Sequence, residues 1–497
     1  MNIAMLLQMA AEVGPDRPAL TCHHRHYTYG ELFNAAKAAS EAFKASGCGF
    51  VSVLDTSNPA VPIAMFGAAM AGLPYVPLNY RLAADRLNDL IERISPSYLI
   101  VGTEKLDGYA DRTGITAETS DQFVSGVLAT ANPDVTWPED PSAIAVQLFT
   151  SGTTGTPKAA VLRHEHLMSY ILGSVDFASA EEDEATLVSV PPYHIAGISA
   201  LLSSLYAARR IVLLPDFGAA AWLELVKLEN VTNAFVVPTM LSRIIDHLDT
   251  IEHEPDVASL KAVAYGGGKM TQPVIARALE LFPNVNFTNA YGLTETSSTI
   301  TLLTPDDHRD ALASDDPRIR RRLGSVGKPL PSVEIEIRDE DGKVLGPDTP
   351  GEIYVRGPQV SGEYRERSAL DADGWFPTRD AGEMDTDGFL CLTGRADDVI
   401  VRGGENISPS EIEDVLHDHA AIADAAAVAV PSDEWGETVG IAVVLKEGGE
   451  TNAHELQHLI RTRLRSSRVP EHVLFVDELP YNEMGKLLRR EIKLLFV

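Results

Sequence analysis

The chain has 497 residues, 45% of them hydrophobic and 23% charged, so it can bury a large core and should form more than one domain. A short peptide factor or a disordered tail is excluded. Its 71 acidic residues outnumber its 41 basic ones, which gives a formal net charge of −30. Because such a surface repels nucleic acids and anionic lipids, a phosphate-bearing ligand would need a local cradle of backbone N–H groups and cations.

The cysteines and the apolar runs bear on the cellular setting. Cys22, Cys48 and Cys391 lie far apart without a CxxC spacing, which argues against a zinc site or a disulfide framework. The N-terminal stretch has no basic region, and no apolar run approaches the roughly 20 residues of a membrane span. We therefore expect a soluble protein of the reducing cytoplasm.

The first part of the chain alternates between helical and strand patterns. Helical apolar spacing in YGELFNAAKAASEAF is followed by the short apolar runs FVSVLD, YVPLN and SYLIVG. A similar alternation returns between residues 208 and 268, in ARRIVLLPDF, WLELVKLEN, NAFVVPTMLSRIIDHL and LKAVAYGGG. Units of this length suit strands joined by crossover helices, so the pattern predicts two stacked α/β subdomains.

From about Gly324 the pattern changes to period-2 alternation. VEIEIRDEDGKVL and GEIYVRG read as strands, and Asp341-Gly342 is a turn signal, so a smaller β-rich portion is expected here.

The last hundred residues read as a compact α+β module. Ser408 is predicted as a helix N-cap, Pro409 as the first helical residue, and Glu411 as the partner that completes a capping box. The apolar runs AAAVAV, IAVVLK and HVLFV follow, with one helix between them. We expect a large N-terminal domain over residues 1–395 and a small mobile lid domain over residues 396–497, joined by a hinge of few residues.

The most informative segment is LFTSGTTGTPKAAVLRH, from Leu148 to His164. Glycines, hydroxyl side chains and Lys158 follow a β-forming run, and such a loop can surround a phosphate chain because glycine has no Cβ to block the approach. It is not a Walker A motif, since Pro157 separates Gly155 and Thr156 from the lysine.

This loop resembles the nucleotide loop of the adenylate-forming superfamily, which contains acyl-CoA and aryl-CoA ligases, firefly-type luciferases and peptide-synthetase adenylation domains. Further segments resemble the signature blocks of that superfamily in order and spacing: PPYHIAG, YGGG, NAYGLTETS, GWFPTRD, GRADDVIVRGGENISPSEIE and YNEMGK. The resemblance implies that a carboxylate attacks the α-phosphorus of ATP to give an acyl-adenylate and pyrophosphate, and that a thiol then attacks the activated carbonyl. It implies ATP, Mg²⁺ and CoA as cofactors.

The resemblance also implies roles for individual residues. The β- and γ-phosphates would be held by the phosphate-loop residues Thr150, Ser151, Gly152, Thr153, Thr154, Gly155 and Lys158. Glu295 would bind Mg²⁺, and Thr294 would contact the α-phosphate. Asp380 and Arg395 would bind the ribose. Tyr291 would stack on adenine, and the surrounding wall would comprise Gly266, Gly267, Gly268, Asn289, Ala290 and Gly292.

Six further residues concern the two half-reactions. Lys486 in YNEMGK is the expected catalytic lysine of adenylation, and Asp397 is the expected hinge about which the small domain turns to bring in its Gly403-Gly404 face. His194 is expected to act as a gate between the acyl pocket and the thiol tunnel. Trp435 resembles a tryptophan that aryl-CoA ligases place along the pantetheine path.

Three departures from the superfamily pattern stand out. Ala159 replaces the usual glycine after Lys158, Arg379 occupies the usual glycine position before Asp380, and EYRERSALDADG is shorter than its usual counterpart. A cation at Arg379 could perturb the nucleotide geometry beside the ribose contact or offset the acidic field.

HIAGISALLSSLY has no acid to pair an amino group, and no carrier-protein segment is fused to the chain, so an acid–CoA ligase is the favoured hypothesis. The alternatives are an acyl-AMP ligase that loads a separate carrier protein, and a luciferase-like oxygenase. A non-catalytic nucleotide-binding protein would not need Lys486 and Glu295. The expected pocket segments, residues 194–199, 236–240, 265–268 and 293–300, are small or apolar, which favours an aromatic or short- to medium-chain aliphatic monocarboxylate. Lys269 would reverse this preference if it pointed inward. The sequence leaves a homodimer open.

Overall fold

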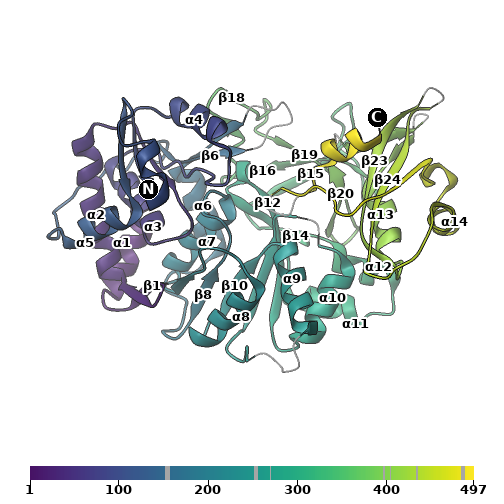
Figure 1. Cartoon of the computed structure of the whole chain (residues 1–497), viewed down its shortest axis with the longest axis horizontal. Coiled ribbons are helices and arrows are strands. Elements are labelled where there is room, and N and C mark those ends of the chain that lie inside the picture. Colours follow the sequence, from purple (N-terminus) through teal and green to yellow (C-terminus); the bar gives the residue numbers. More distant parts are fainter. Residues whose placement is uncertain are drawn as a thin grey trace.

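The computed structural model describes residues 1–150, 157–250, 256–268, 270–395, 398–402, 405–432, 435–482 and 487–496, with the backbone alone described at 405 and 406. The chain folds into a large N-terminal domain and a smaller C-terminal domain (Figure 1). The predicted mixed α/β architecture is confirmed.

The first α/β subdomain is built on two small sheets that share one bridging residue. A parallel sheet consists of β3 (Phe50–Leu54), β4 (Ser97–Val101) and β5 (Ile115–Thr119), and an antiparallel sheet has the order β18-β17-β7-β6. The bounds of the latter are β6 (Ile144–Thr150), β7 (Lys158–Arg163), β17 (Glu363–Tyr364) and β18 (Arg367–Ser368). Tyr75 bridges β3 and β6 as a single residue. The strand expected in YVPLN shrinks to this bridge because the flanking Pro74 and Pro77 have no N–H to donate.

Helices cover this subdomain and connect it to the second one. They are α1 (Ala4–Val13), α2 (Tyr29–Ser46), α3 (Ala60–Ala71), α4 (Ala84–Arg93) and α5 (Ser120–Ala129). Thr28 and Glu31 form a capping box at the start of α2, and Gly47 ends it in the left-handed conformation. Helix α1 packs on α2 and α3 and also on α7 (Ile195–Tyr206) of the second subdomain, so the two halves share one hydrophobic core.

The second subdomain is built on a nine-stranded sheet in the order β14-β13-β12-β11-β10-β8-β9-β1-β2. Its strands are β8 (Ala185–Val188), β9 (Arg210–Leu213), β10 (Asn233–Val236), β11 (Ala262–Gly266), β12 (Asn286–Leu293), β13 (Ser298–Leu303), β14 (Lys328–Pro329), β1 (Pro18–Cys22) and β2 (Arg25–Thr28). Strands β8 to β12 are parallel to one another and are linked by crossover helices. The N-terminal hairpin β1–β2 extends this sheet and not the sheet of its own half.

The helices of the second subdomain surround its sheet (Figure 1). They are α6 (His164–Ser174), α8 (Ala219–Leu228), α9 (Pro238–Thr250), α10 (Gln272–Leu281), α11 (Pro305–Ala313) and the short α12 (Pro317–Arg321).

The β-rich portion is a four-stranded antiparallel sheet. Its strands are β15 (Glu334–Arg338), β16 (Gly351–Arg356), β19 (Phe376–Met384) and β20 (Leu390–Arg395). The predicted turn at Asp341-Gly342 is present, and Gly342 has φ +81°. One face of the sheet buries Ile353 and Val355 against Tyr291 of β12, which places the sheet beside the nine-stranded one.

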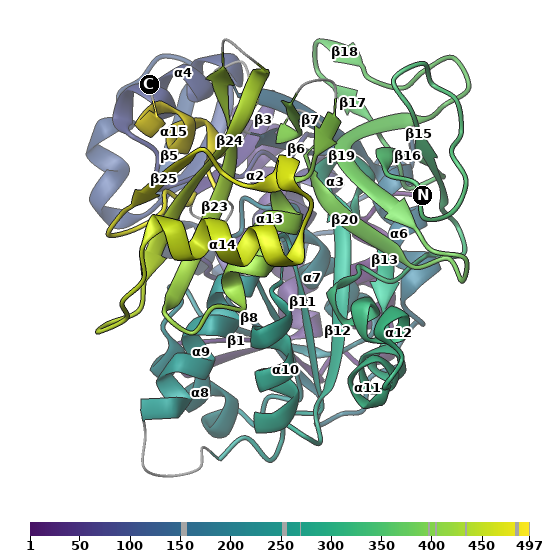
Figure 2. The same ribbon diagram turned by 90° about the vertical axis from the view of Figure 1, so that its right-hand side faces the viewer.

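The small domain has a sheet and a core of its own. The order is β22-β21-β24-β23, with β25 paired to β24, and the bounds are β21 (Ile400–Arg402), β22 (Glu405–Ile407), β23 (Ile422–Ser432), β24 (Gly436–Leu445) and β25 (His472–Phe475). Helices α13 (Pro409–His417), α14 (Ala453–Arg463) and α15 (Arg489–Lys493) pack around this sheet (Figure 2). Helix α14 is the one helix expected between the apolar runs.

The start of α13 corrects one prediction. Ser408 is the N-cap and Pro409 is the first helical residue, as expected, but no capping box forms. The Ser408 hydroxyl donates to the Thr393 carbonyl oxygen, and the Glu411 carboxylate accepts a hydrogen bond from Arg468 Nε at 2.9 Å. Tertiary partners have taken both side chains away from the local motif.

Among the helices that the structure describes, none combines the length and the apolar character needed to cross a lipid bilayer.

Candidate active site

A buried cluster forms where β12 meets the β-rich sheet. Asp380 of β19 and Arg395 at the end of β20 face each other across the two strands, and Arg395 Nη1 lies 2.6 Å from Asp380 Oδ1. Tyr291 of β12 donates its hydroxyl proton to Asp380 Oδ2 at 2.7 Å. Burial, and then the charge of Asp380, raise the pKa of Tyr291, so the phenol keeps the proton it donates. The structure therefore brings together the three residues expected at ribose and adenine.

The glycine wall is formed by two adjacent parallel strands. Gly266 of β11 pairs with Ala290 of β12, and a Cβ added to Gly266 would lie 2.1 Å from the Ala290 carbonyl oxygen. A Cβ on Gly292 would lie 1.7 Å from the Ser298 oxygen. Beyond the strand, Gly267 has φ +80°, and both it and Gly268 are exposed. Gly266 and Gly292 thus allow close backbone packing, and Gly267 and Gly268 lie at the surface.

Asn289 and Tyr265 fix this wall from behind. Asn289 Nδ2 donates to the Ser325 carbonyl oxygen at 3.0 Å. The Tyr265 hydroxyl lies 2.8 Å from His308 Nε2, and the other nitrogen of that imidazole lies 2.7 Å from the Thr304 oxygen. These contacts anchor β11 and β12 to α11 and to the loop that precedes β14.

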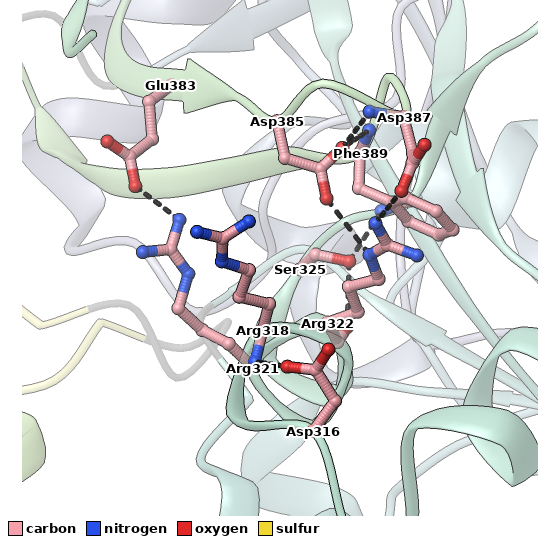
Figure 3. Close-up of polar contacts among 10 residues, drawn as sticks. Asp316, Arg318, Arg321, Arg322, Ser325, Glu383, Asp385, Asp387 and Phe389 are labelled. Carbon is pink, nitrogen blue, oxygen red and sulfur yellow. Dashed lines mark hydrogen bonds and ion pairs between the residues drawn. The ribbon is translucent and has the colours of Figure 1, made fainter. Parts of the chain in front are cut away.

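An ionic clamp holds the β19–β20 hairpin against the same region (Figure 3). Arg321 of α12 pairs with Glu383 at 2.6 Å, and Arg322 pairs with Asp385 at 2.9 Å and with Asp387. The Ser325 hydroxyl donates to the Arg322 oxygen at 2.7 Å. Because Ser325 also contacts Asn289, the clamp connects the hairpin that carries Asp380 to the glycine wall.

The expected metal ligand is buried. Glu295 lies in a 3₁₀ turn directly after β12, next to Thr294, with only 8% of its surface exposed. Its Oε1 accepts a hydrogen bond from the Tyr364 hydroxyl at 2.7 Å. The ring of Tyr364 lies 5.5 Å from Lys158 Nζ. Thr150 and Lys158, at the two ends of the phosphate loop, pair with each other across β6 and β7.

These residues fit Mg²⁺. One buried carboxylate with one oxygen still available suits a cation that usually takes one or two carboxylates and completes its shell with nucleotide phosphates and water. In the described ranges no group of three or more His, Cys, Asp and Glu side chains is placed to build an all-protein metal cage.

Tyr364 is the site residue that the sequence analysis missed. The segment EYRERSALDADG drew attention through its length alone. The sequence offered one signal for Tyr364: it is an aromatic residue two positions after a glycine. Only the tertiary structure shows which carboxylate its hydroxyl reaches.

His194 caps the N-terminus of α7. Its ring packs on Tyr193 with a centroid separation of 4.5 Å, and its Nε2 is buried without a hydrogen-bond partner among the described residues. Burial, and then the positive charge of Arg81, lower the pKa of His194 to about 3, so the ring is neutral at physiological pH. A neutral imidazole whose Nε2 makes no hydrogen bond within the described part of the chain is compatible with the expected gate.

Arg379, at the usual glycine position before Asp380, pairs with a carboxylate. Its φ of +62° is the left-handed conformation that glycine favours. Its side chain is largely exposed, and its Nε lies 3.7 Å from Glu352 of β16. The cation is therefore paired with a carboxylate of the neighbouring strand.

Several expected site residues lie outside the described part of the chain: Ser151, Gly152, Thr153, Thr154, Gly155, Lys269, Asp397, Gly403, Gly404 and Lys486. The flanks of Lys486 are described. Tyr481 and Leu487 form an antiparallel bridge, and Tyr481 donates to Asp424 Oδ2 at 2.7 Å. Arg489 Nη2 lies 2.9 Å from Glu413, and Arg489 Nε lies 3.6 Å from Asp398.

Trp435, the remaining expected residue of the small domain, lies at the β23–β24 turn. Its side chain is 42% exposed, and the Arg402 guanidinium lies 5.7 Å from its ring.

The fold and this site define an enzyme that binds a nucleotide on a large α/β domain next to a small α+β domain. The sequence profile of the AMP-binding enzyme family matches residues 7–365, and that of the AMP-binding enzyme C-terminal domain matches residues 411–486. The chain belongs to this family of adenylate-forming ligases.

Relatives span nearly the whole chain. The indoleacetate–CoA ligase of Aromatoleum aromaticum is 30% identical and aligns over 99% of this chain and 98% of its own length. The fatty acid–[acyl-carrier-protein] ligase ScoC of Streptomyces coeruleorubidus is 29% identical over 97% and 94%. The o-succinylbenzoate CoA synthetase MenE of Bacillus subtilis, solved with its acyl-adenylate intermediate, is 29% identical, covers 98% of this chain and 97% of that one, and superposes with a TM-score of 0.83. It has also been solved with ATP and magnesium, with a TM-score of 0.82 over 98% and 99% of the two chains.

Proposed function

We propose that the protein is an acid–CoA ligase that activates an aromatic or short- to medium-chain aliphatic monocarboxylate as its acyl-adenylate. The observation that carries the proposal is that the site residues form two clusters near the end of β12. In the first cluster, Asp380 contacts Arg395 and Tyr291. In the second, Glu295 and Lys158 lie on either side of Tyr364. The first cluster suits a nucleoside and the second suits its phosphates and a divalent cation.

In the first half-reaction the chain binds and orients. Asp380 accepts hydrogen bonds from the ribose hydroxyls, while Arg395 and Tyr291 hold its carboxylate in place. Lys158 and the phosphate loop neutralise the β- and γ-phosphates, and Thr294 donates to the α-phosphate. Glu295 holds Mg²⁺, which when bound neutralises charge on the phosphate oxygens. Lys486 brings its ammonium to the attacking carboxylate and the α-phosphate.

In the second half-reaction the small domain changes its orientation. We place the boundary between Arg395 and Ala396, with Asp397 as the hinge and residues 396–497 as the moving unit. Rotation would remove Lys486 from the adenylate and bring in the Gly403-Gly404 face, with Trp435 along the path of pantetheine. The neutral His194, whose Nε2 has no hydrogen-bond partner among the described residues, would move aside to open the thiol tunnel.

CoA is the acceptor that we favour, because two of the three relatives above are named for CoA. A separate carrier protein is the second candidate, because ScoC is named as an [acyl-carrier-protein] ligase and aligns over nearly the full chain. We infer a cytoplasmic location from the three cysteines, which are free thiols in the structure.

The test is pyrophosphate release with ATP and Mg²⁺ across a panel of aryl and aliphatic acids, with and without CoA. We expect acid-dependent release, formation of acyl-CoA, and loss of adenylation in Lys486→Ala but not in the control Lys493→Ala. Adenylate that is never transferred to CoA would favour the carrier-protein acceptor. Absence of release with every acid would contradict the proposal.

A further inference from the structure

Tyr364 lies on an extended segment, residues 359–365, that leaves the β-rich portion and runs toward the candidate active site. We call this segment the strap. Its first half is bound to the backbone of Glu295 and of residues that follow it. The Ser361 and Gly362 N–H groups donate to the backbone carbonyl oxygen of Glu295 at 2.9 and 3.0 Å. Gln359 Nε2 donates to the backbone carbonyl oxygens of Thr296 and Thr299 at 3.1 and 2.7 Å. The strap therefore follows the turn that carries the metal ligand.

The second half of the strap is bound to the strand that leaves the phosphate loop. Tyr364 pairs with Ala160 of β7, and the Arg365 N–H donates to the Ala159 oxygen at 2.9 Å (Figure 2). Gly362 makes the bend between the two halves with φ +53°, and a Cβ there would lie 2.4 Å from Leu370 Cδ2. Tyr364 is thus fixed by backbone contacts between the turn of Glu295 and the strand of Lys158.

The Tyr364 hydroxyl is hydrogen-bonded to one oxygen of the Glu295 carboxylate. It donates to Glu295 Oε1 at 2.7 Å, and it is the one side-chain donor to this carboxylate in the part of the chain that the structure describes. The hydrogen bond restricts rotation of the carboxylate and leaves Oε2 available.

We propose that Tyr364 is a positioning residue that orients Glu295 so that its second oxygen binds the divalent cation of the nucleotide complex. This inference rests on the proposed role of Glu295. Carboxylates that bind metals are commonly held by a hydrogen bond to their other oxygen, and loss of such a partner typically weakens metal binding about 10- to 100-fold.

Tyr364→Phe removes the hydroxyl and keeps the ring beside Lys158. The matched control is Tyr98→Phe, because Tyr98 is a buried tyrosine whose hydroxyl donates to Glu118 between β4 and β5. Both variants lose one tyrosine–glutamate hydrogen bond, but only one of them is at the site. Glu295→Gln is the reference for loss of the ligand itself.

The measurement is Mn²⁺ binding to the full-length protein with a non-hydrolysable ATP analogue, followed by electron paramagnetic resonance. We expect Tyr364→Phe to weaken Mn²⁺ binding about 10-fold or more, in the direction of Glu295→Gln, while Tyr98→Phe stays within about twofold of the wild type. Binding of the analogue without metal should be equal in all four proteins. Wild-type Mn²⁺ affinity in Tyr364→Phe, or equal weakening in Tyr98→Phe, would overturn the proposal.

This readout does not depend on the proposed reaction. If the wild type binds Mn²⁺ with the analogue but activates no acid, the ligase assignment fails while the role of Tyr364 is still decided by the comparison of variants. Where an acid is activated, Tyr364→Phe should also raise the Mg²⁺ concentration for half-maximal pyrophosphate release by a similar factor, with the KM for the acid unchanged.

Discussion

The nucleotide cluster of the large domain and the anchor of the lysine loop in the small domain are built differently. Asp380 and Arg395 meet because they occupy facing positions on paired strands, so the backbone register of β19 and β20 places them. The loop that carries Lys486 is closed at its base by an isolated backbone bridge between Tyr481 and Leu487. Side chains on its two flanks tie it to the rest of the small domain, through Tyr481 with Asp424 and Arg489 with Glu413 and Asp398. The first arrangement is therefore set by continuous strand pairing, whereas the second depends on one isolated bridge and a few side-chain contacts that substitutions can remove one at a time.

The largest loss of stability should come from Arg489→Met in the small domain. The Glu413 side chain is 6% exposed and would lose its buried counter-charge. Removing one partner of a buried ion pair costs about 3–5 kcal/mol. We expect hydrogen exchange to rise throughout β23 and α13 and adenylation to fall, while nucleotide binding by the large domain persists.

The matched control is Arg463→Met, which breaks an exposed pair with Asp418 in the same domain and should cost about 0–1 kcal/mol. Equal loss of protection in both domains of Arg489→Met would show that the small domain does not respond as a separate unit.

Asp380→Asn tests the other region. It leaves Arg395 without its charge partner, and because that guanidinium side chain is 32% exposed, the loss should be smaller than the about 3–5 kcal/mol of a fully buried pair. We expect a higher KM for ATP and lower stability of the large domain in chemical denaturation.

Glu334→Gln, which breaks the exposed pair with Arg356 on the same sheet, serves as the control and should leave the KM for ATP unchanged. An unaltered KM in Asp380→Asn would remove this residue from the nucleotide site.

The buried imidazole of His194 should make the stability of the large domain depend on pH. Its pKa in the folded protein is about 3, below the ordinary value of 6.5, so the unfolded chain binds the extra proton more readily. The contribution of neutral His194 to the free energy of unfolding is complete above pH 6.5. It is lost as the pH falls toward 3, with a slope of up to about 1.4 kcal/mol per pH unit. Denaturation of His194→Gln between pH 7 and pH 4 should show a shallower loss than the wild type; parallel curves would contradict a buried neutral imidazole.

The smallest effect should come from Arg379→Gly. The left-handed backbone at φ +62° costs a non-glycine residue roughly 1–2 kcal/mol, part of which is offset by the greater freedom of glycine in the unfolded chain. We expect stabilisation by about 0.5–1 kcal/mol in thermal unfolding. Arg379→Ala keeps the strained backbone and should not stabilise; if it does so to the same extent, the side chain and not the backbone is responsible.

Local sequence signals predicted much of the fold and part of the site. The alternation of strands and helices, the turn at Gly342 and the single helix between the apolar runs of the small domain are all present. The predictions that failed depended on competition with distant partners. Ser408 and Glu411 have the spacing of a capping box, but Thr393 and Arg468 bind them instead, and a strand expected in YVPLN is limited to Tyr75 by its prolines.

The sequence by itself determined the class of enzyme, because glycines, hydroxyls, carboxylates and lysines at fixed spacings can be recognised one segment at a time. Only the tertiary structure decided which segments meet. It attached the N-terminal hairpin to the sheet of the second half, turned Arg379 toward Glu352, and brought Tyr364 to Glu295 across 69 positions of sequence. Such contacts depend on strand pairing between remote segments, which no local pattern of residue types specifies.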